Sequence, residues 1–152
     1  MKCRNCKEKL SVNFADLGFS PPSNAYLKKE DLNKAEHYYP LRVDVCENCF
    51  LVQTQDFVLP EIIFNEDYAY LSSTSKGFLD HCENYSNEII SRLGLNKDSF
   101  VVEIASNDGY LLKNFLHRDI PCLGIEPTKS TANVARSIGL RVEESFFGEE
   151  AA

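Results

Sequence analysis

The sequence lacks a long hydrophobic run, an apolar leader and a cluster of basic residues. About 20 consecutive apolar residues are needed to span a bilayer, and no run within the 152 residues approaches that length. Residues 1–6 contain two cysteines, a lysine and an arginine, whereas a signal peptide needs an apolar core near this position. We therefore expect a cytoplasmic protein with no membrane partner.

The formal net charge of −7 comes from 16 basic and 23 acidic side chains, and the acidic excess lies in the second part of the chain. Residues 1–60 carry eight basic and eight acidic side chains, while residues 61–152 carry eight and fifteen. A surface that neutralises phosphates needs clustered Lys and Arg, so we expect no nucleic-acid partner. With 43% hydrophobic and 26% charged residues, the composition is that of a folded globular protein.

Residues 1–60 and residues 61–94 differ in their hydrophobic pattern. Residues 1–60 have the pattern of short strands and loops, with a turn at Gly18 and a hairpin made of strands 41–45 and 50–54. A short helix is expected at residues 60–64, where proline takes the first position. Residues 61–94 connect residues 1–60 with residues 95–152 through a polar and aromatic loop and a helix over residues 75–93. Gly94 stands where this helix should end.

Residues 95–152 alternate between strands and helices. The expected strands are residues 100–105, 122–126 and 140–142; the expected helices are residues 110–116 and 130–138, with another beginning within residues 148–152. The compact apolar run at 100–105 is typical of a strand buried on both faces. The alternation predicts a Rossmann-like, doubly wound parallel sheet. Since three strands make about half of such a fold, we expect this chain to be the amino-terminal part of a longer protein.

Four cysteines form two Cys-x-x-Cys pairs separated by 39 residues: Cys3, Cys6, Cys46 and Cys49. Two such turns supply four thiolates in a tetrahedral shell, which suits a structural zinc ion with no open position. The metal would stabilise a module too small for a large core. The pattern leaves two alternatives open, namely buried or redox-active cysteines and an iron centre of the iron–sulfur or rubredoxin type. The expected fold class is therefore α/β, a small zinc-bound β-rich module followed by the truncated Rossmann-like domain.

The turn after strand 100–105 has the composition of a nucleotide-type cofactor site. A tight turn between a strand and a helix lets the backbone approach a ligand closely, and Asn107 and Gly109 tolerate the left-handed conformation that such a turn requires. Glu126 ends the next strand, where a carboxylate can accept hydrogen bonds from ribose hydroxyls. Glu103 lies inside an apolar strand, where burial is costly unless a cationic group pairs with it. The alternative is an ordinary α/β turn with a solvated Glu126.

Three motifs together resemble one family. They are the two Cys-x-x-Cys pairs, the Tyr-Ala-Tyr-Leu-Ser-Ser segment at residues 68–73 and the Glu-x-Ala-Ser-Asn-Asp-Gly-Tyr-Leu-Leu sequence at residues 103–112. The chain is similar, from its first cysteine to its last residue, to zinc-containing, S-adenosylmethionine-dependent C-methyltransferases that act on nucleotide-linked deoxysugars. The resemblance implies a methyltransferase domain after the zinc module. Members of this family are much longer than 152 residues, so the rest of the chain is an expected partner.

The resemblance also implies roles for individual residues. Glu103 matches the acid that contacts the methionine end of the cofactor, Gly109 the last glycine of the general methyltransferase loop, and Glu126 the ribose-binding acid. Ala105 and Asn107 replace the two earlier glycines of that loop. The cofactor-binding set that this implies is Ser73, Glu103, Ala105, Ser106, Asn107, Asp108, Gly109 and Glu126. Tyr68 and Tyr70 would lie near the reacting carbon as catalytic residues; alternatively, they pack the seam between the domains.

These observations favour methyl transfer from S-adenosylmethionine to a carbon of a nucleotide-linked keto-deoxysugar. Residues 1–152 would be inactive alone, because the groups that close the site and the catalytic base would lie further along the chain. Two alternatives stay open. A non-catalytic zinc-ribbon interaction module would explain the cysteines but not the turn at residues 103–109, and an NAD-dependent Rossmann oxidoreductase would explain Glu126 but not the absence of Gly-x-Gly-x-x-Gly.

Overall fold

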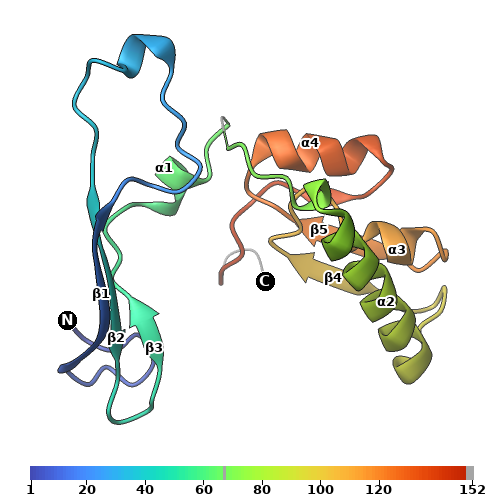
Figure 1. The fold of residues 1–152 in the computed structure, drawn as a ribbon. Coiled ribbons are helices and arrows are strands. Elements are labelled where there is room, and N and C mark those ends of the chain that lie inside the picture. The colour runs from blue at the N-terminus through green and yellow to red at the C-terminus, as the bar shows by residue number, and fades with distance from the viewer. Residues whose placement is uncertain (67, 150–152) are drawn as a thin grey trace. The chain divides into compact units, whose positions relative to one another are not determined.

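A computed structural model describes residues 1–66 and 68–149. The chain divides into two compact units, Met1–Ile63 and Phe64–Ala152, and Figure 1 shows their elements. The end of the helix expected within residues 148–152 lies outside the described residues. Within those residues, no helix combines the length and the apolar character needed to cross a membrane.

The first unit is built on an antiparallel sheet in the order β1-β2-β3, with β1 at Val12–Ser20, β2 at Tyr39–Val45 and β3 at Val52–Thr54. Strands β2 and β3 are the predicted hairpin, which is confirmed, and the second cysteine pair lies in the turn between them. Two short helices complete the unit, η1 at Lys29–Asp31 and α1 at Pro60–Ile63. The predicted helix at Pro60 is therefore also confirmed.

The turn expected at Gly18 is wrong, because Gly18 lies within strand β1. The pairing register between β1 and β2 shifts between Asp16 and Phe19, as in a β-bulge. Gly18 adopts a φ of 77° there, and its backbone N–H donates to Asp16 Oδ1 at 3.0 Å. Glycine supplies the left-handed backbone that the bulge requires, so the residue bends a strand and does not end one.

The second unit begins with the short helix η2 at Ser72–Thr74 and the long helix α2 at Lys76–Leu93. Helix α2 confirms the predicted helix at both ends. The Ser75 side chain accepts from the backbone N–H of Phe78, and Gly94 takes the left-handed conformation of a C-terminal cap with a φ of 64°.

A parallel sheet in the order β4-β5-β6 follows, with β4 at Val101–Ile104, β5 at Cys122–Ile125 and β6 at Val142–Glu143. Helix α3 at Lys113–Leu116 connects β4 to β5, and helix α4 at Lys129–Ser137 connects β5 to β6. Helix α3 begins three residues later than expected, because residues 110–112 form turns. The mixed α/β class is confirmed, while the doubly wound arrangement stays a prediction.

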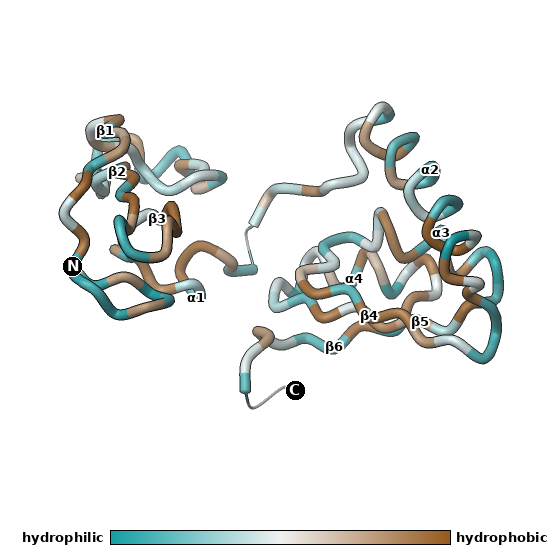
Figure 2. Tube along the Cα trace, turned by 90° about the horizontal axis from the view of Figure 1, so that it is seen from below, coloured by the Kyte–Doolittle hydropathy of each residue, from teal (hydrophilic) through white to brown (hydrophobic). Residues whose placement is uncertain are grey.

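The core of this unit lies on one face of the sheet. The buried cluster contains Leu112 just before α3, Phe115 of α3, Ala135 of α4 and Cys122 of β5. Ile90 of α2 packs against it. Among the described residues the other face of β4 is open, with Val102 48% and Ile104 53% exposed. The expectation that this strand is buried on both faces is therefore wrong for residues 68–149. Figure 2 shows β4 and β5 mostly in the brown of hydrophobic residues.

Candidate functional site

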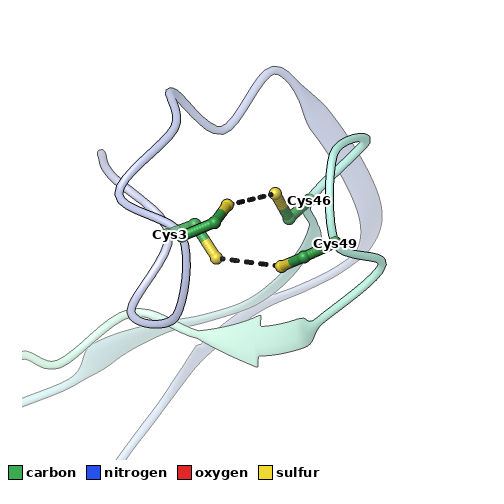
Figure 3. A group of neighbouring side chains, drawn as sticks. Cys3, Cys46 and Cys49 are labelled. Carbon is green, nitrogen blue, oxygen red and sulfur yellow. Dashed lines mark hydrogen bonds between the residues drawn. The ribbon is translucent and has the colours of Figure 1, made fainter.

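The four paired cysteines converge at one point of the first unit. Cys3 and Cys6 come from the amino-terminal loop, and Cys46 and Cys49 from the turn after β2. The sulfur atoms of Cys3 and Cys49 lie 3.6 Å apart, those of Cys6 and Cys46 lie 3.4 Å apart, and all four lie within 4.8 Å of one another. Figure 3 shows the labelled cysteines directed toward a common centre.

This geometry fits a zinc ion held by sulfur alone. Four ligands about 2.3 Å from a tetrahedral zinc lie about 3.8 Å from one another, close to the two measured sulfur–sulfur separations of 3.4 and 3.6 Å. A disulfide would bring the sulfurs to about 2.05 Å, and all six cysteines are free. Because four thiolates fill the tetrahedral shell, no position remains for a substrate, and the arrangement suits a structural metal.

Hydrogen bonds to the sulfurs favour the thiolate form that a metal binds. The backbone N–H of Cys6 and the side chain of Gln53 lower the pKa of Cys3 to about 6, and Gln53 Nε2 lies 3.4 Å from Cys3 Sγ. For Cys46, the backbone N–H of Cys49 opposes burial and the neighbouring thiols, which together raise its pKa to about 11. A cation bound among the four sulfurs would oppose this rise and favour the thiolate of Cys46.

Gln53 is a site residue that the sequence did not reveal. It is buried, and it is fixed from both ends of its amide, since its Oε1 accepts from the backbone N–H of Arg4 at 3.0 Å. Partners of this kind orient metal ligands and tune their basicity. Gln53 is the middle residue of β3, and it is buried while the residues on either side of it in the strand are exposed. This position in the strand was the only local sign that Gln53 belongs to the site.

In the second unit, the turn after β4 has an unusual backbone. Ala105, Asn107 and Gly109 have φ angles of 59°, 50° and 81°, so the chain reverses its curvature at alternate positions over residues 105–109, which we call the β4 turn. Ser106 donates its N–H to the Ile125 carbonyl at 3.2 Å, which ties the turn to β5. The left-handed backbone at Asn107 and Gly109 is the conformation expected from the sequence at this turn.

Glu126, at the end of β5, is buried and engaged by the backbone. Its Oε2 accepts from the Asn107 N–H at 2.9 Å and its Oε1 accepts from the Thr128 N–H at 2.8 Å. The carboxylate is only 4% exposed, so the alternative of a solvated Glu126 is wrong. Each carboxylate oxygen retains acceptor capacity after these bonds, and the proposed ribose contact is compatible with them.

Glu103 faces the helix side of the sheet, next to Tyr110. Burial is the main cause that raises the pKa of Glu103 to about 7; the Tyr110 hydroxyl opposes the rise, and the negative charges of Asp108 and Glu126 add to it. Burial and the Glu103 charge in turn raise the pKa of Tyr110. Beside them lies a cavity of about 260 Å³ whose lining is Phe78, His81, Cys82, Tyr85, Tyr110 and Leu111.

Buried polar atoms around the β4 turn make the site suitable for a polar ligand. Glu103 Oε2, Asp108 Oδ1 and Ser106 Oγ have no hydrogen-bond partner within the described part of the chain. Unsatisfied buried oxygens cost free energy, and a bound ligand with donor groups would remove that cost. The residues present therefore fit a cofactor that carries hydroxyl and ammonium donors.

The segment that holds the two predicted tyrosines, residues 68–73, lies against the β4 turn. Ser72 and Ser73 donate their N–H groups to Asn107 Oδ1 and Asp108 Oδ2, at 2.9 and 3.1 Å. The Tyr68 ring contacts the Phe64 ring in a tilted arrangement, with 5.3 Å between ring centres, and Tyr70 is exposed. The structure thus brings Ser73 and the tyrosine segment to the turn.

Comparisons with known proteins agree with this arrangement. Residues 3–64 match the family described as "Putative zinc binding domain". Over 149 residues, 98% of this chain, the sequence is 28% identical to the C-methyltransferase NovU of Streptomyces niveus. The chain spans 35% of the length of that curated relative. The two matches confirm the resemblance to zinc-containing C-methyltransferases that the sequence motifs indicate.

Proposed function

We propose that this chain is the zinc-binding and cofactor-binding part of an S-adenosylmethionine-dependent C-methyltransferase whose substrate is a nucleotide-linked keto-deoxysugar. One observation carries the proposal: a parallel strand ends in a turn with left-handed residues at alternate positions, and the acid of the next strand binds that turn through the Asn107 N–H. This combination of a tight turn and an adjacent carboxylate suits an adenosyl ribose. The similarity to a C-methyltransferase supports the choice of reaction.

In this proposal, different residues around the β4 turn bind different parts of the cofactor. The backbone of Ala105, Ser106 and Gly109 lies beside the cofactor, and Glu126 accepts hydrogen bonds from its ribose hydroxyls. Glu103, half-buried and with a free Oε2, binds the ammonium group of the methionine end. The bound cofactor supplies an electrophilic methyl group on a positively charged sulfonium. The negative potential of these carboxylates favours binding of that charge. The Ser73 hydroxyl is the last of the proposed cofactor-binding groups.

In this proposal, Tyr68 and Tyr70 act on the sugar substrate as catalytic residues. A keto group acidifies the proton on the adjacent carbon, so that a base can remove it and negative charge develops on the keto oxygen. A tyrosine hydroxyl that donates to this oxygen stabilises the charge. Tyr70 is 49% exposed, and in this proposal its hydroxyl reaches the substrate. The zinc module acts through structure alone, since its four thiolates leave no position for a ligand.

Calorimetry on the complete protein tests the cofactor. We expect S-adenosylhomocysteine to bind and NAD not to bind, because the β4 turn lacks the Gly-x-Gly-x-x-Gly spacing of dinucleotide sites. Binding of NAD alone would support an oxidoreductase, and binding of neither would favour a zinc module without catalysis. Either result would refute the proposal.

Methyl transfer is measured with labelled S-adenosylmethionine and a nucleotide-linked 4-keto-deoxysugar. We expect labelled sugar from the complete protein and none from residues 1–152 alone, because holding donor and acceptor in line accounts for about 7–11 kcal/mol of barrier lowering and requires a closed site. Tyr70→Phe should lower the rate about 10²-fold through loss of one oxyanion donor. The matched control is Tyr26→Phe, at an exposed tyrosine of the first unit. Equal losses in both variants would remove Tyr70 from the mechanism.

A further inference from the structure

The short helix η2 starts without a cap of its own. Its N-cap residue, Leu71, makes no side-chain hydrogen bond to the helix, although the first N–H groups of any helix lack partners within it. The partners come from 35 residues further along the chain: Asn107 Oδ1 accepts from Ser72, and Asp108 Oδ2 accepts from Ser73. The conformation of η2 therefore depends on the β4 turn.

Asn107 uses both ends of its amide for this contact. Its Oδ1 binds the Ser72 N–H at 2.9 Å, and its Nδ2 donates to the Tyr70 carbonyl at 3.2 Å. One side chain thus fixes the backbone on both sides of Leu71. Asn107 and Asp108 are buried, so that water competes weakly for these bonds.

The same residue also connects Tyr70 to Glu126. The Asn107 N–H donates to Glu126 Oε2 at 2.9 Å, while its side chain holds the Tyr70 carbonyl. A φ of 50° at Asn107 directs the backbone N–H and the side chain to these different partners, and asparagine tolerates that conformation better than most residues. The proposed ribose acid and the proposed catalytic tyrosine are therefore joined through one residue, by its backbone N–H on one side and its side chain on the other.

We infer that Asn107 and Asp108 are positioning residues, whose side chains hold residues 70–73, and with them the Tyr68 and Tyr70 rings, in register with the β4 turn. The inference rests on the proposed function for its catalytic consequence and on the three hydrogen bonds for the contact itself. The two side chains then act on the rate of methyl transfer through the tyrosine segment, and the backbone of the turn remains available to the cofactor.

Amide hydrogen exchange in the complete protein, without ligand, tests the contact. We expect slow exchange at the Ser72 and Ser73 amides. Asn107→Gly keeps the left-handed backbone accessible and removes the side chain, so the Ser72 amide should exchange about tenfold faster, as for loss of one hydrogen bond. The matched control is Asn24→Gly in the first unit, where φ is 60°, and it should leave both amides unchanged.

A pair of variants at Asp108 separates the acceptor from the charge. Asp108→Asn retains an oxygen that can accept from Ser73 and should retain the protection of that amide, whereas Asp108→Ala should lose it. Unprotected Ser72 and Ser73 amides in the wild-type protein would overturn the inference. Unchanged exchange in both Asn107→Gly and Asp108→Ala would overturn it as well.

The catalytic consequence has its own readout. Asn107→Gly keeps the backbone N–H that donates to Glu126 Oε2 and removes both side-chain hydrogen bonds to residues 70–72 without adding a charge. We expect kcat to fall about 10²-fold, as for a small misplacement of reacting groups, while the dissociation constant of S-adenosylhomocysteine stays unchanged. A loss of affinity with kcat retained would instead make Asn107 a cofactor ligand and overturn the inference. If the wild-type protein binds no S-adenosylhomocysteine, the proposed function fails, and faster exchange in Asn107→Gly still supports the contact.

Discussion

Glu103→Gln should make the second unit more stable at high pH and have little effect at low pH. The carboxyl group of Glu103 has a pKa of about 7 against 4.5 for a free group, mainly because of burial. At 1.36 kcal/mol per pKa unit this rise corresponds to roughly 3 kcal/mol, and residual exposure reduces it to about 2 kcal/mol. Glutamine keeps the shape of the side chain and has no charge to bury.

The sign of the pH dependence follows from proton binding. Between pH 4.5 and about 7, the folded state holds the Glu103 proton and the unfolded state does not. The contribution of Glu103 to the free energy of unfolding therefore falls as pH rises through this window and is constant above it. Relative to the wild type, Glu103→Gln should gain about 2 kcal/mol between pH 5 and pH 8.

Denaturant unfolding of the complete protein, followed by circular dichroism at pH 5 and pH 8, measures this difference. Glu83→Gln, at an exposed position of α2, is the matched control and should follow the pH dependence of the wild type. The reasoning is refuted if Glu103→Gln shows the same stability difference from the wild type at both pH values.

The Glu103 proton should be released to solvent when the ammonium group of the cofactor binds. A positive group beside Glu103 favours the carboxylate, so binding of S-adenosylhomocysteine at pH 6 should release up to one proton, and binding at pH 8 should release almost none. Calorimetry in phosphate and in Bis-Tris detects the release, because the two buffers differ in ionisation enthalpy. Equal heats in both buffers at pH 6 would show that the cofactor ammonium does not meet Glu103.

Three further predictions concern the metal, the β4 turn and the ribose acid. Cys46→Ser should lower the zinc content from about one ion per chain to none and unfold the first unit, since binding and folding are coupled; elemental analysis and circular dichroism measure both. Gly109→Ala should lower the free energy of unfolding by about 2–4 kcal/mol, because the added Cβ would lie 2.3 Å from Leu140 Cδ1 at a φ of 81°; Gly94→Ala, with open space around it, should cost only about 1 kcal/mol, and equal losses in denaturant unfolding would contradict the steric argument. Glu126→Ala should weaken S-adenosylhomocysteine binding by about 1.5–3 kcal/mol, and an unchanged dissociation constant in calorimetry would remove Glu126 from the site.

Features that depend on neighbouring residues in the sequence could be predicted well. Helix α2 follows from an apolar residue at every third or fourth position and from local caps at Ser75 and Gly94. The four-cysteine cluster follows from the Cys-x-x-Cys spacing and from a hairpin that places Cys46 and Cys49 in its turn. In each case one short stretch of chain contains the whole physical cause.

Features that depend on which elements pack together could not be predicted in this way. Strand β1 has no clean alternation, and its bulge at Gly18 exists only because β1 pairs with β2. The apolar run of β4 indicated burial on both faces, but the described helices cover one face, so Val102 and Ile104 are exposed. An apolar run records the tendency to be buried and says nothing about what is available to cover it.

The sequence by itself determined which four cysteines form the cluster, the position of the β4 turn and the carboxylate at the end of β5. Only the tertiary structure decided what these groups contact. It placed Gln53 on a sulfur of the cysteine cluster, and it buried Glu126 under the Asn107 and Thr128 amides. It also joined Asn107 to a segment 35 residues earlier in the chain. Hydrogen bonds over such separations depend on the register of the strands and the packing of the helices, which no local pattern of residues specifies.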